Sequence, residues 1–268
     1  MLDVTTEIIA NATIPKSRIF IFKSHDIYYL TVFFLVCSHH FKNEFKDSEL
    51  IYSKMIELLH TMGDDLMVVN AARVSFAKES TEFKEQDAKL ITYLAKHNHI
   101  SPFFHPQIQF RIKMPLFVAR EWYRHQIGFA RNEVSRRYVD IAPECWIPEE
   151  NEIRERDPKL KQGSKETASP YSEQLHVQMS QATEYSVKIY NNLIENNVAP
   201  EIARAILPQS MYTEFIETGS LAAYARLYKL RTSPDAQREI QKYARMIGEE
   251  LSKKFPVSWA ALTASVSV

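Results

Sequence analysis

The sequence predicts a mixed fold of the α+β class for a chain of 268 residues. Two observations support this prediction. Residues 105–114 alternate between apolar and polar side chains, which is the period of a strand with one buried face. Three longer segments instead repeat apolar side chains at helical spacing, which predicts amphipathic helices over residues 83–97, 172–196 and 235–254.

Composition narrows the classes of function. The formal net charge is zero, which argues against a general nucleic-acid binder that relies on excess positive charge. The five glycines form neither a G-x-G-x-x-G nor a Walker-type loop, so a Rossmann turn is not expected to hold a dinucleotide. Cys37 and Cys145 have no metal-ligand spacing and do not indicate a secreted disulfide framework. We therefore expect a protein of the reducing cytoplasm with no bound metal.

The most apolar run of the chain lies near its amino terminus, at residues 27–37. These eleven residues are too few to span a bilayer, and no small-residue cleavage pattern of a signal peptide follows them. We expect no membrane partner. The favoured interpretations of this run are a strand or short helix packed on the domain, or a translated upstream stretch; the core of a signal peptide is the alternative.

The predicted strand has two distinct faces, and a helix is expected to follow it. The apolar face comprises Ile108, Phe110, Ile112 and Met114, and the polar face comprises Gln107, Gln109, Arg111 and Lys113. Pro115 then occupies a position at which helices begin. The predicted helix carries Phe117, Trp122 and Tyr123 and ends by delivering Arg124 to a polar cluster.

Residues 149–170 have a different character. They are polar and charged, are bracketed by prolines, and contain no Asn-Gly or Asp-Gly hairpin signal. This composition predicts a mobile loop.

The segment from Arg124 to Tyr138 concentrates the polar chemistry of the chain. It contains four arginines together with histidine, glutamate, asparagine, serine and tyrosine. Forked guanidinium groups suit phosphate, and serine and asparagine add short-range hydrogen bonds. The segment therefore predicts a binding site for an anionic ligand, with a solvated basic turn as the alternative.

This segment resembles the signature of the flavin-dependent thymidylate synthases, which reads Arg-His-Arg, seven residues, then serine. The residues that match are Arg124, His125, Asn132, Glu133, Ser135, Arg137 and Tyr138. Gln126 stands in place of the third motif residue, and there is one extra residue in the expected loop before Asn132. We expect Arg131, in that loop, to supply the charge that Gln126 lacks.

Four further segments resemble blocks of the same family and occur in its order. They are residues 63–76, 97–105, 203–213 and 230–240. The resemblance covers roughly residues 50 to 256, whereas the first 46 residues match nothing in the family. It implies an amino-terminal extension of unknown role at residues 1–46 and a synthase-like domain at residues 47–268.

The resemblance also implies a twisted, mostly antiparallel sheet flanked by helices, in a homotetramer with active sites between subunits. The implied reaction is the conversion of dUMP to dTMP. Methylenetetrahydrofolate would be the carbon donor, and FAD reduced by NADPH would be the hydride source.

The same resemblance implies which residues bind the nucleotide. The implied dUMP ligands are Glu121, Arg124, Glu133, Ser135, Arg136, Arg137, Arg204 and Arg231. Arg231 would be catalytic, because it would stabilise negative charge that develops on the uracil ring. Glu121 stands where the family often has glutamine. We expect Ser135 to bind substrate and not to act as a nucleophile with His125 as its base, because no third orienting group is visible.

A second set of positions matches contacts of the flavin. The implied FAD ligands are Ser101, Arg124, His125, Gln126, Glu133, Ser220 and Arg226, with Ser75 and His99 as weaker candidates. Ser220 belongs to an expected turn at residues 220–222. Asp235 replaces a histidine that some members place against the cofactor.

Two alternative functions come from other classes. A nucleotide- or RNA-binding relative that has lost flavin is favoured by Gln126, the extra residue and Asp235. A phosphoryl-transfer enzyme built on the Arg124-His125 pair is less consistent with the sequence. In phosphohistidine enzymes such a pair comes just after a strand and before glycine, whereas here it ends a predicted helix.

Overall fold

The computed structural model describes residues 55–139, 142–159 and 163–264. The predicted extension at residues 1–46, with its apolar run at residues 27–37, lies outside the described residues.

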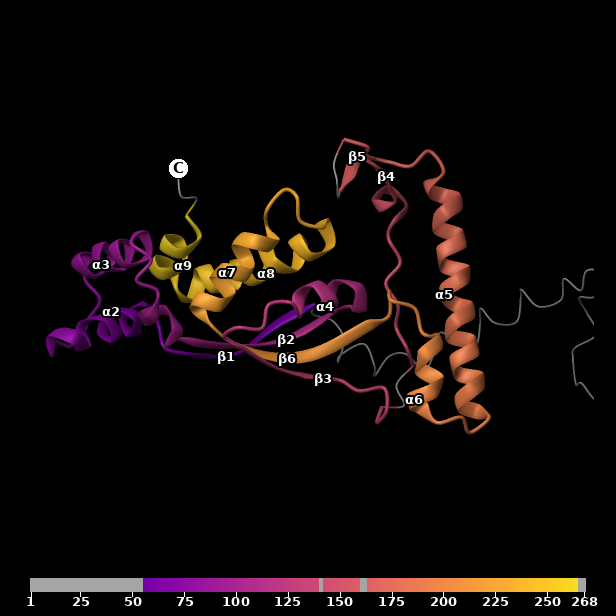
Figure 1. Cartoon of the computed structure of the whole chain (residues 1–268), viewed down its shortest axis with the longest axis horizontal. Helices are drawn as coiled ribbons and strands as arrows, with labels where there is room; N and C mark the ends of the chain where they lie inside the picture. The colour runs from indigo at the N-terminus through magenta and orange to yellow at the C-terminus, as the bar shows by residue number, and fades with distance from the viewer. Residues whose placement is uncertain (1–54, 140–141, 160–162, 265–268) are drawn as a thin grey trace, which may run out of the picture. The chain divides into compact units, whose positions relative to one another are not determined.

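The domain is built on an antiparallel sheet of four strands in the order β1-β2-β6-β3 (Figure 1). The strands are β1 (Ile56–Met62), β2 (Gln107–Pro115), β6 (Tyr212–Ser220) and β3 (Phe129–Glu133). Each neighbouring pair is antiparallel. The central pair joins β2 to a strand about a hundred residues later, with Ile112 opposite Phe215. The expected antiparallel sheet is therefore confirmed.

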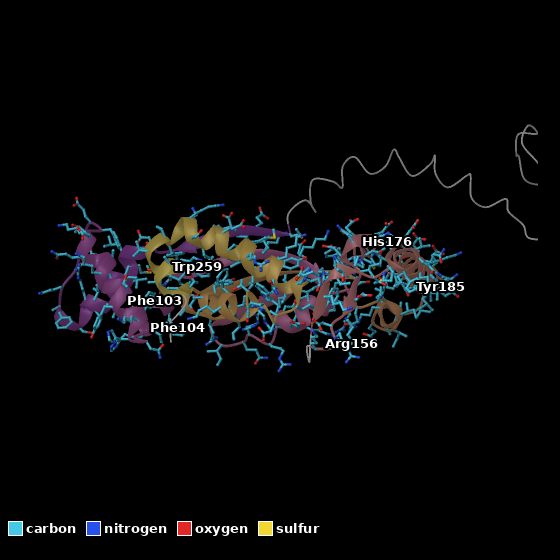
Figure 2. The ribbon with its side chains drawn as sticks, turned by 90° about the horizontal axis from the view of Figure 1, so that it is seen from above. Phe103, Phe104, Arg156, His176, Tyr185 and Trp259 are labelled. Carbon is cyan, nitrogen blue, oxygen red and sulfur yellow. The ribbon has the colours of Figure 1, made fainter. Side chains whose placement is uncertain are left out.

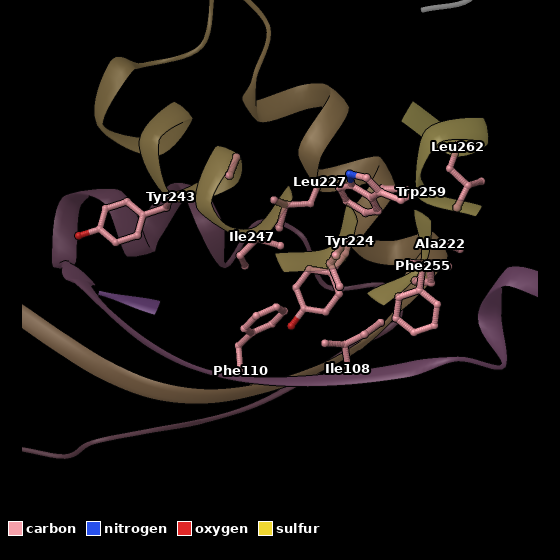
Figure 3. Packing of buried hydrophobic residues seen from close by; sticks show 14 of the residues in the cluster. Ile108, Phe110, Ala222, Tyr224, Leu227, Tyr243, Ile247, Phe255, Trp259 and Leu262 are labelled. Atoms are coloured by element: carbon pink, nitrogen blue, oxygen red, sulfur yellow. The ribbon is translucent and has the colours of Figure 1, made fainter. Parts of the chain in front are cut away.

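Helices cover one face of this sheet (Figure 1). They are α4 (Leu116–Trp122), α7 (Leu221–Arg231), α8 (Arg238–Lys254) and α9 (Pro256–Thr263). The core lies between the two layers, where Ile108 and Phe110 of β2 meet Tyr224 of α7 and Ile247 of α8 (Figure 3). The apolar face predicted for β2 is fully buried, because the alternating side chains of a strand point to opposite sides of its sheet.

The predicted helices are confirmed, with small differences at their ends. They are α3 (Glu85–Lys96), α5 (Ser172–Glu195) and α8. Asp64 is the N-cap of helix α2 (Asp65–Arg73), and its carboxylate accepts a hydrogen bond of 3.0 Å from the Met67 amide. The short η2 turn (Ser101–Phe104) buries Phe103 completely but leaves Phe104 37% exposed, and Figure 2 labels both side chains.

Two expectations about the fold are wrong. The segment at residues 149–170 does not lack regular structure, since it contains the turn η3 (Glu150–Glu152) and the paired strands β4 (Arg154–Arg156) and β5 (Ser164–Ala168). The hairpin forms without a recognisable turn sequence, and ion pairs of Arg154 with Glu239 and of Glu166 with Arg238 join it to α8. Lys113 is also not on a solvated face: it is 7% exposed, and its Nζ lies 2.5 Å from a carboxylate oxygen of Glu144. The alternation could not show a carboxylate partner in a later loop.

Candidate functional site

The carboxyl end of α4 positions the start of the polar cluster. Pro115 is the N-cap of this helix, and Trp122, its last residue, is fully buried. The amide of His125 donates to the Trp122 carbonyl at 3.1 Å, which turns the chain directly after the helix. His125 is only 9% exposed, whereas Arg124 lies on the surface. The predicted delivery of a polar cluster by a core-packed helix is thereby confirmed.

Arg231, the last residue of α7, lies against His125 and Glu121, and these three residues form what we call the Arg231 corner. Its Nε donates to Nε2 of His125 at 2.9 Å, and its two terminal nitrogens donate to the side chain and the carbonyl of Glu121 at 3.3 and 3.1 Å. Three hydrogen bonds thus fix the direction of one guanidinium group. A cation held in place in this way can stabilise an anion without reorganising first.

His125 is held in its neutral form. Burial, followed by the positive charges of Arg231 and Arg131, lowers its pKa from 6.5 to about 4. Because Nε2 accepts the hydrogen bond from Arg231, the ring proton of the neutral imidazole is placed on Nδ1. The ring can therefore donate a hydrogen bond from Nδ1 while Nε2 orients the arginine.

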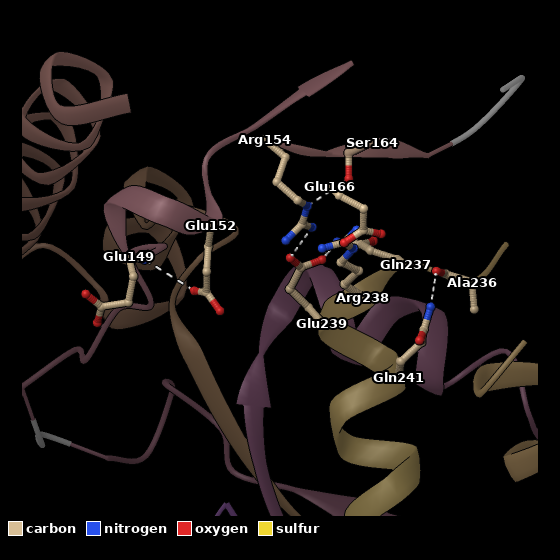
Figure 4. A network of polar contacts seen from close by, with 10 residues as sticks. All are labelled: Glu149, Glu152, Arg154, Ser164, Glu166, Ala236, Gln237, Arg238, Glu239 and Gln241. Carbon is tan, nitrogen blue, oxygen red and sulfur yellow. Dashed lines mark hydrogen bonds and ion pairs between the residues drawn. The ribbon is translucent and has the colours of Figure 1, made fainter. Parts of the chain in front are cut away.

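A cleft of about 960 Å³ opens beside this corner. Glu121, Arg231 and Asp235 line it together with the β4–β5 hairpin and the start of α8. Arg154 of the hairpin donates to Ser164 at 2.7 Å and pairs with Glu239 of α8 at 3.0 Å, which closes this side of the cleft (Figure 4). The Asp235 carboxylate accepts a hydrogen bond from Ser233.

The motif turn after His125 packs against the start of α7. Gly128 has a φ of +84°, and an added Cβ would lie 2.9 Å from Ala223 and 3.2 Å from the Ser220 hydroxyl. Arg226 of α7 donates to the carbonyl of Ile127 at 2.6 Å. Three expected flavin positions, Gln126, Ser220 and Arg226, therefore lie close together where this turn meets α7. Phe104, at the end of the turn that Ser101 begins, also approaches Gly128.

Residues 220–222 do not form the expected turn. Ser220 ends β6 and is also the N-cap of α7, where its hydroxyl accepts a hydrogen bond of 3.2 Å from the Ala223 amide. A strand that runs directly into a helix needs no separate turn residues. The expectation of a turn is wrong because β6 extends to Ser220 and α7 starts at Leu221.

A second group of candidate residues gathers at the far end of β3, around a cleft of about 510 Å³. The candidates that line this cleft are Glu133, Ser135, Arg136 and Arg204. A carboxylate oxygen of Glu133 accepts from the Thr213 hydroxyl at 2.5 Å. Arg137 lies next to the cleft, and its Nε is 3.5 Å from a carboxylate oxygen of Glu201.

The expected nucleotide ligands of one chain are not brought together. Glu121 and Arg231 line the larger cleft, whereas Ser135, Arg136 and Arg204 line the smaller one. Ser75 and His99 are exposed, and the His99 ring lies 6.2 Å from that of Tyr93. The candidates thus form two separate groups in one chain.

Comparison with known proteins identifies the family. The family described as thymidylate synthase complementing protein matches residues 57–257. A flavin-dependent thymidylate synthase from Kosmotoga olearia is 40% identical over 207 residues, which cover 77% of this chain and 88% of the relative. A protein of the same description from Thermus thermophilus is 38% identical over 206 residues, covering 77% of this chain and 74% of the relative.

The chain belongs to the flavin-dependent thymidylate synthase family. A solved structure agrees: the UMP/dUMP methylase PolB from Streptomyces cacaoi, bound with 5-Br dUMP, superposes with a TM-score of 0.70 at 30% identity. The match covers 78% of this chain and 94% of that chain. The predicted fold class is confirmed, as is the prediction of an FAD-dependent methyltransferase of the flavin-dependent thymidylate synthase family.

One expectation within the family signature is wrong. Arg131 does not lie in a loop beside Gln126; it lies on β3 and pairs with Glu217 of β6. Its guanidinium carbon is 4.8 Å from the centre of the Phe129 ring and 5.5 Å from that of Tyr123. This charge neutralises a buried carboxylate, so Arg131 does not take over the role of the missing arginine.

Glu217 lies outside every motif that points to the site. This side chain is fully buried and accepts hydrogen bonds from the Trp122 indole at 3.2 and 3.1 Å. A signal was present, because Thr213, Phe215 and Gly219 share its phase on β6. A charged residue at an inward position of a strand predicts a buried partner.

Two findings limit other classes of site within the described ranges. No group of three or more histidine, cysteine, aspartate or glutamate side chains there is arranged to hold a metal ion. No helix in that part of the chain has the length and apolar character needed to cross a bilayer.

Proposed function

We propose that this protein converts dUMP to dTMP, with methylenetetrahydrofolate as carbon donor and NADPH as the reductant that recharges FAD. The family assignment and the likeness to a dUMP methylase support the reaction. The observation within this chain that carries the proposal is Arg231, which His125 and Glu121 orient at the edge of a large cleft.

Arg231 is the residue to which we assign catalysis. Its guanidinium group would lie against the uracil ring and stabilise the negative charge that develops there during methyl transfer. Glu121 and His125 would hold this group in direction. Since the His125 pKa is about 4, the imidazole would stay neutral near pH 7 and would add no second positive charge.

The nucleotide phosphate is assigned to the group at the end of β3. Arg137 and Arg204 would provide forked donors, and Ser135 would add a hydroxyl. The amide of Arg137 donates to the Ser135 hydroxyl oxygen at 3.3 Å, which keeps the two residues in one compact turn. Glu133 and Arg136 would border the same ligand. Arg124 would meet the nucleotide or the flavin from the α4 side.

The corner formed by Gly128, Ser220 and Arg226 suits the diphosphate of a flavin. It combines the amino terminus of an eleven-residue helix with an arginine and a hydroxyl. Ser101, His125, Gln126 and Glu133 would complete the contacts. FAD, when bound, would supply the hydride for the reaction.

The separation of the two groups supports a shared active site in a homotetramer. Glu121 and Arg231 of one subunit would face Ser135, Arg137 and Arg204 of another. Several large apolar side chains are exposed and would suit burial between subunits. They include Phe76 at 75%, Val74 at 72% and Ile127 at 71% exposure.

Residues 47–268 would form the synthase domain and residues 1–46 an extension of unknown role, since the family match begins at residue 57. We expect a cytoplasmic enzyme that uses small-molecule substrates and binds neither nucleic acid nor membranes.

The test is an assay of the purified protein with FAD, dUMP, methylenetetrahydrofolate and NADPH. We expect a yellow protein that releases FAD on acid precipitation and forms dTMP, detected by chromatography. A protein that takes up FAD and dUMP but forms no dTMP would instead be a binding relative. A colourless protein that takes up no FAD in titration would contradict the enzymatic proposal.

A further inference from the structure

The Glu217 carboxylate connects three structural elements at the centre of the domain. Its side chain is fully buried on β6. Trp122 of α4 donates to both of its oxygens, and Arg131 of β3 forms an ion pair with it. Burial raises the pKa of the Tyr224 hydroxyl of α7, and the charge of Glu217 raises it further. One carboxylate therefore contacts α4 and β3 and faces α7.

Each of these elements carries part of the proposed active site. Trp122 comes directly before Tyr123, Arg124 and His125. Tyr224 lies two residues before Arg226 on the helix that ends at Arg231. Arg131 lies two residues before Glu133, on the strand that leads to Ser135. A shift of any one element would change where the phosphate-binding group lies relative to the Arg231 corner of the same subunit, and in a shared site each of the two must fit a group of a neighbouring subunit.

The arrangement is costly, which argues for a role beyond filling space. Burial raises the pKa of the Glu217 carboxyl, and the Arg131 guanidinium opposes this effect. Apolar side chains often replace a buried ion pair without loss of stability, so such a pair is weak evidence for a stabilising role. The Arg131 guanidinium is also confined by the rings of Phe129 and Tyr123. Its direction is therefore fixed by packing as well as by charge.

We propose that Glu217 and Arg131 are positioning residues that hold β3, and with it Glu133 and Ser135, in a fixed register against α4 and α7. This inference rests on the proposed function for its ligand, dUMP. Neither residue needs to touch that ligand. Their effect is to set the place of the phosphate-binding group of each subunit relative to its Arg231 corner.

The double variant Arg131→Met/Glu217→Gln tests this role. It removes both charges but keeps an acceptor for Trp122. The unfolding temperature of the variant should therefore lie within a few degrees of that of the native protein. We expect the affinity for dUMP to fall about tenfold, while the affinity for FAD falls less, because Glu133 is the only proposed flavin contact on β3. In the single variant Arg131→Lys, which keeps the ion pair, more of the dUMP affinity should be retained than in Arg131→Met.

The ion pair between Glu214 and Arg111 provides a matched control. It joins the same strand β6 to β2 at 3.1 Å, but its side chains are 27% and 45% exposed. Glu214→Gln should therefore leave the dUMP affinity unchanged. An unchanged dUMP affinity in the double variant, or an equal loss in Glu214→Gln, would overturn the positioning role.

Hydrogen exchange provides a measurement that needs no ligand. In the double variant, amides of β3 at residues 129–133 should exchange about tenfold faster, and those of β2 should not change. Native protein that binds no dUMP would contradict the proposed function, and the exchange of β3 would then decide the positioning role by itself. Unchanged exchange in β3 would refute that role.

Discussion

The two groups of candidate residues differ in how they are held. The Arg231 corner is built from helix ends, and its central side chains bond to one another: His125 is 9% exposed and accepts from Arg231 at 2.9 Å. The group at the end of β3 lies on a turn, where Arg137 and Glu201 are about half exposed and 3.5 Å apart. The first group is organised before any ligand binds, whereas the second would be ordered mainly by the ligand.

This contrast predicts different kinetic effects for substitutions in the two groups. A fixed cation should act on charge that develops during the reaction, and its loss should lower turnover. Exposed side chains that bind the phosphate should contribute to substrate binding, and their loss should lower the affinity for dUMP.

Arg231→Ala should have the largest effect. We expect kcat to fall by about 10²–10³, the scale for one preorganised donor to a developing anion. Steady-state kinetics with saturating dUMP would measure this. Full turnover in the folded variant would show that the guanidinium group does not act on the reacting ring.

The pH dependence of stability should reveal how tightly the first group is organised. The folded-state pKa of His125 is about 4, below its unfolded value of 6.5. Between these values the unfolded chain takes up the proton first, so the stability that His125 contributes is complete above pH 6.5 and is lost as the pH falls towards 4. The resulting loss in the free energy of unfolding amounts to about 3 kcal/mol at most.

Urea unfolding at pH 4 and pH 7 would measure this contribution. The native protein should lose more stability on acidification than His125→Gln. The same acid dependence in both proteins would indicate that His125 is not held in its neutral form.

Arg137→Ala should weaken binding and leave the flavin in place. A charge-assisted bond to phosphate contributes about 1.5–3 kcal/mol, so the affinity for dUMP should fall roughly ten- to a hundredfold. Calorimetric titration with dUMP and the flavin absorbance would measure the two effects separately. If the dUMP affinity does not change, Arg137 is only a surface charge paired with Glu201.

Ser135→Ala should have the smallest effect. A neutral hydrogen bond contributes about 0.5–1.5 kcal/mol, so dUMP affinity should fall by a factor of about 2–13, and turnover should stay measurable. Kinetics over a range of dUMP concentrations would show this as a change in KM. Complete loss of turnover, with a nucleotide adduct mapped to Ser135 in the native protein, would instead identify a nucleophile.

Local patterns predicted the elements whose signals lie within a few residues. The alternation from Ile108 to Met114 marked β2, and Pro115 marked the start of the helix that delivers His125. These predictions held because period and capping are properties of neighbouring residues.

The pairing of distant charges could not be predicted in this way. Arg131 meets Glu217, and Lys113 meets Glu144, across 86 and 31 residues of chain. Which charges meet depends on the strand order β2-β6-β3, and no local pattern specifies that order. The same limit applied to His125 and Arg231, which are 106 residues apart. Only the family resemblance indicated that both belong to the site.

The central claim is that each active site combines the Arg231 corner of one subunit with the phosphate-binding group of another. Co-expression of two impaired variants tests it directly at a low dUMP concentration, with Arg231→Ala, which lowers turnover, and Arg137→Ala/Arg204→Ala, which weakens dUMP binding, carrying different affinity tags. Hybrid oligomers that retain both tags should recover dTMP formation, up to about a quarter of the native activity if subunits mix at random. Hybrids that bind FAD but stay as inactive as either parent would contradict a site shared between subunits.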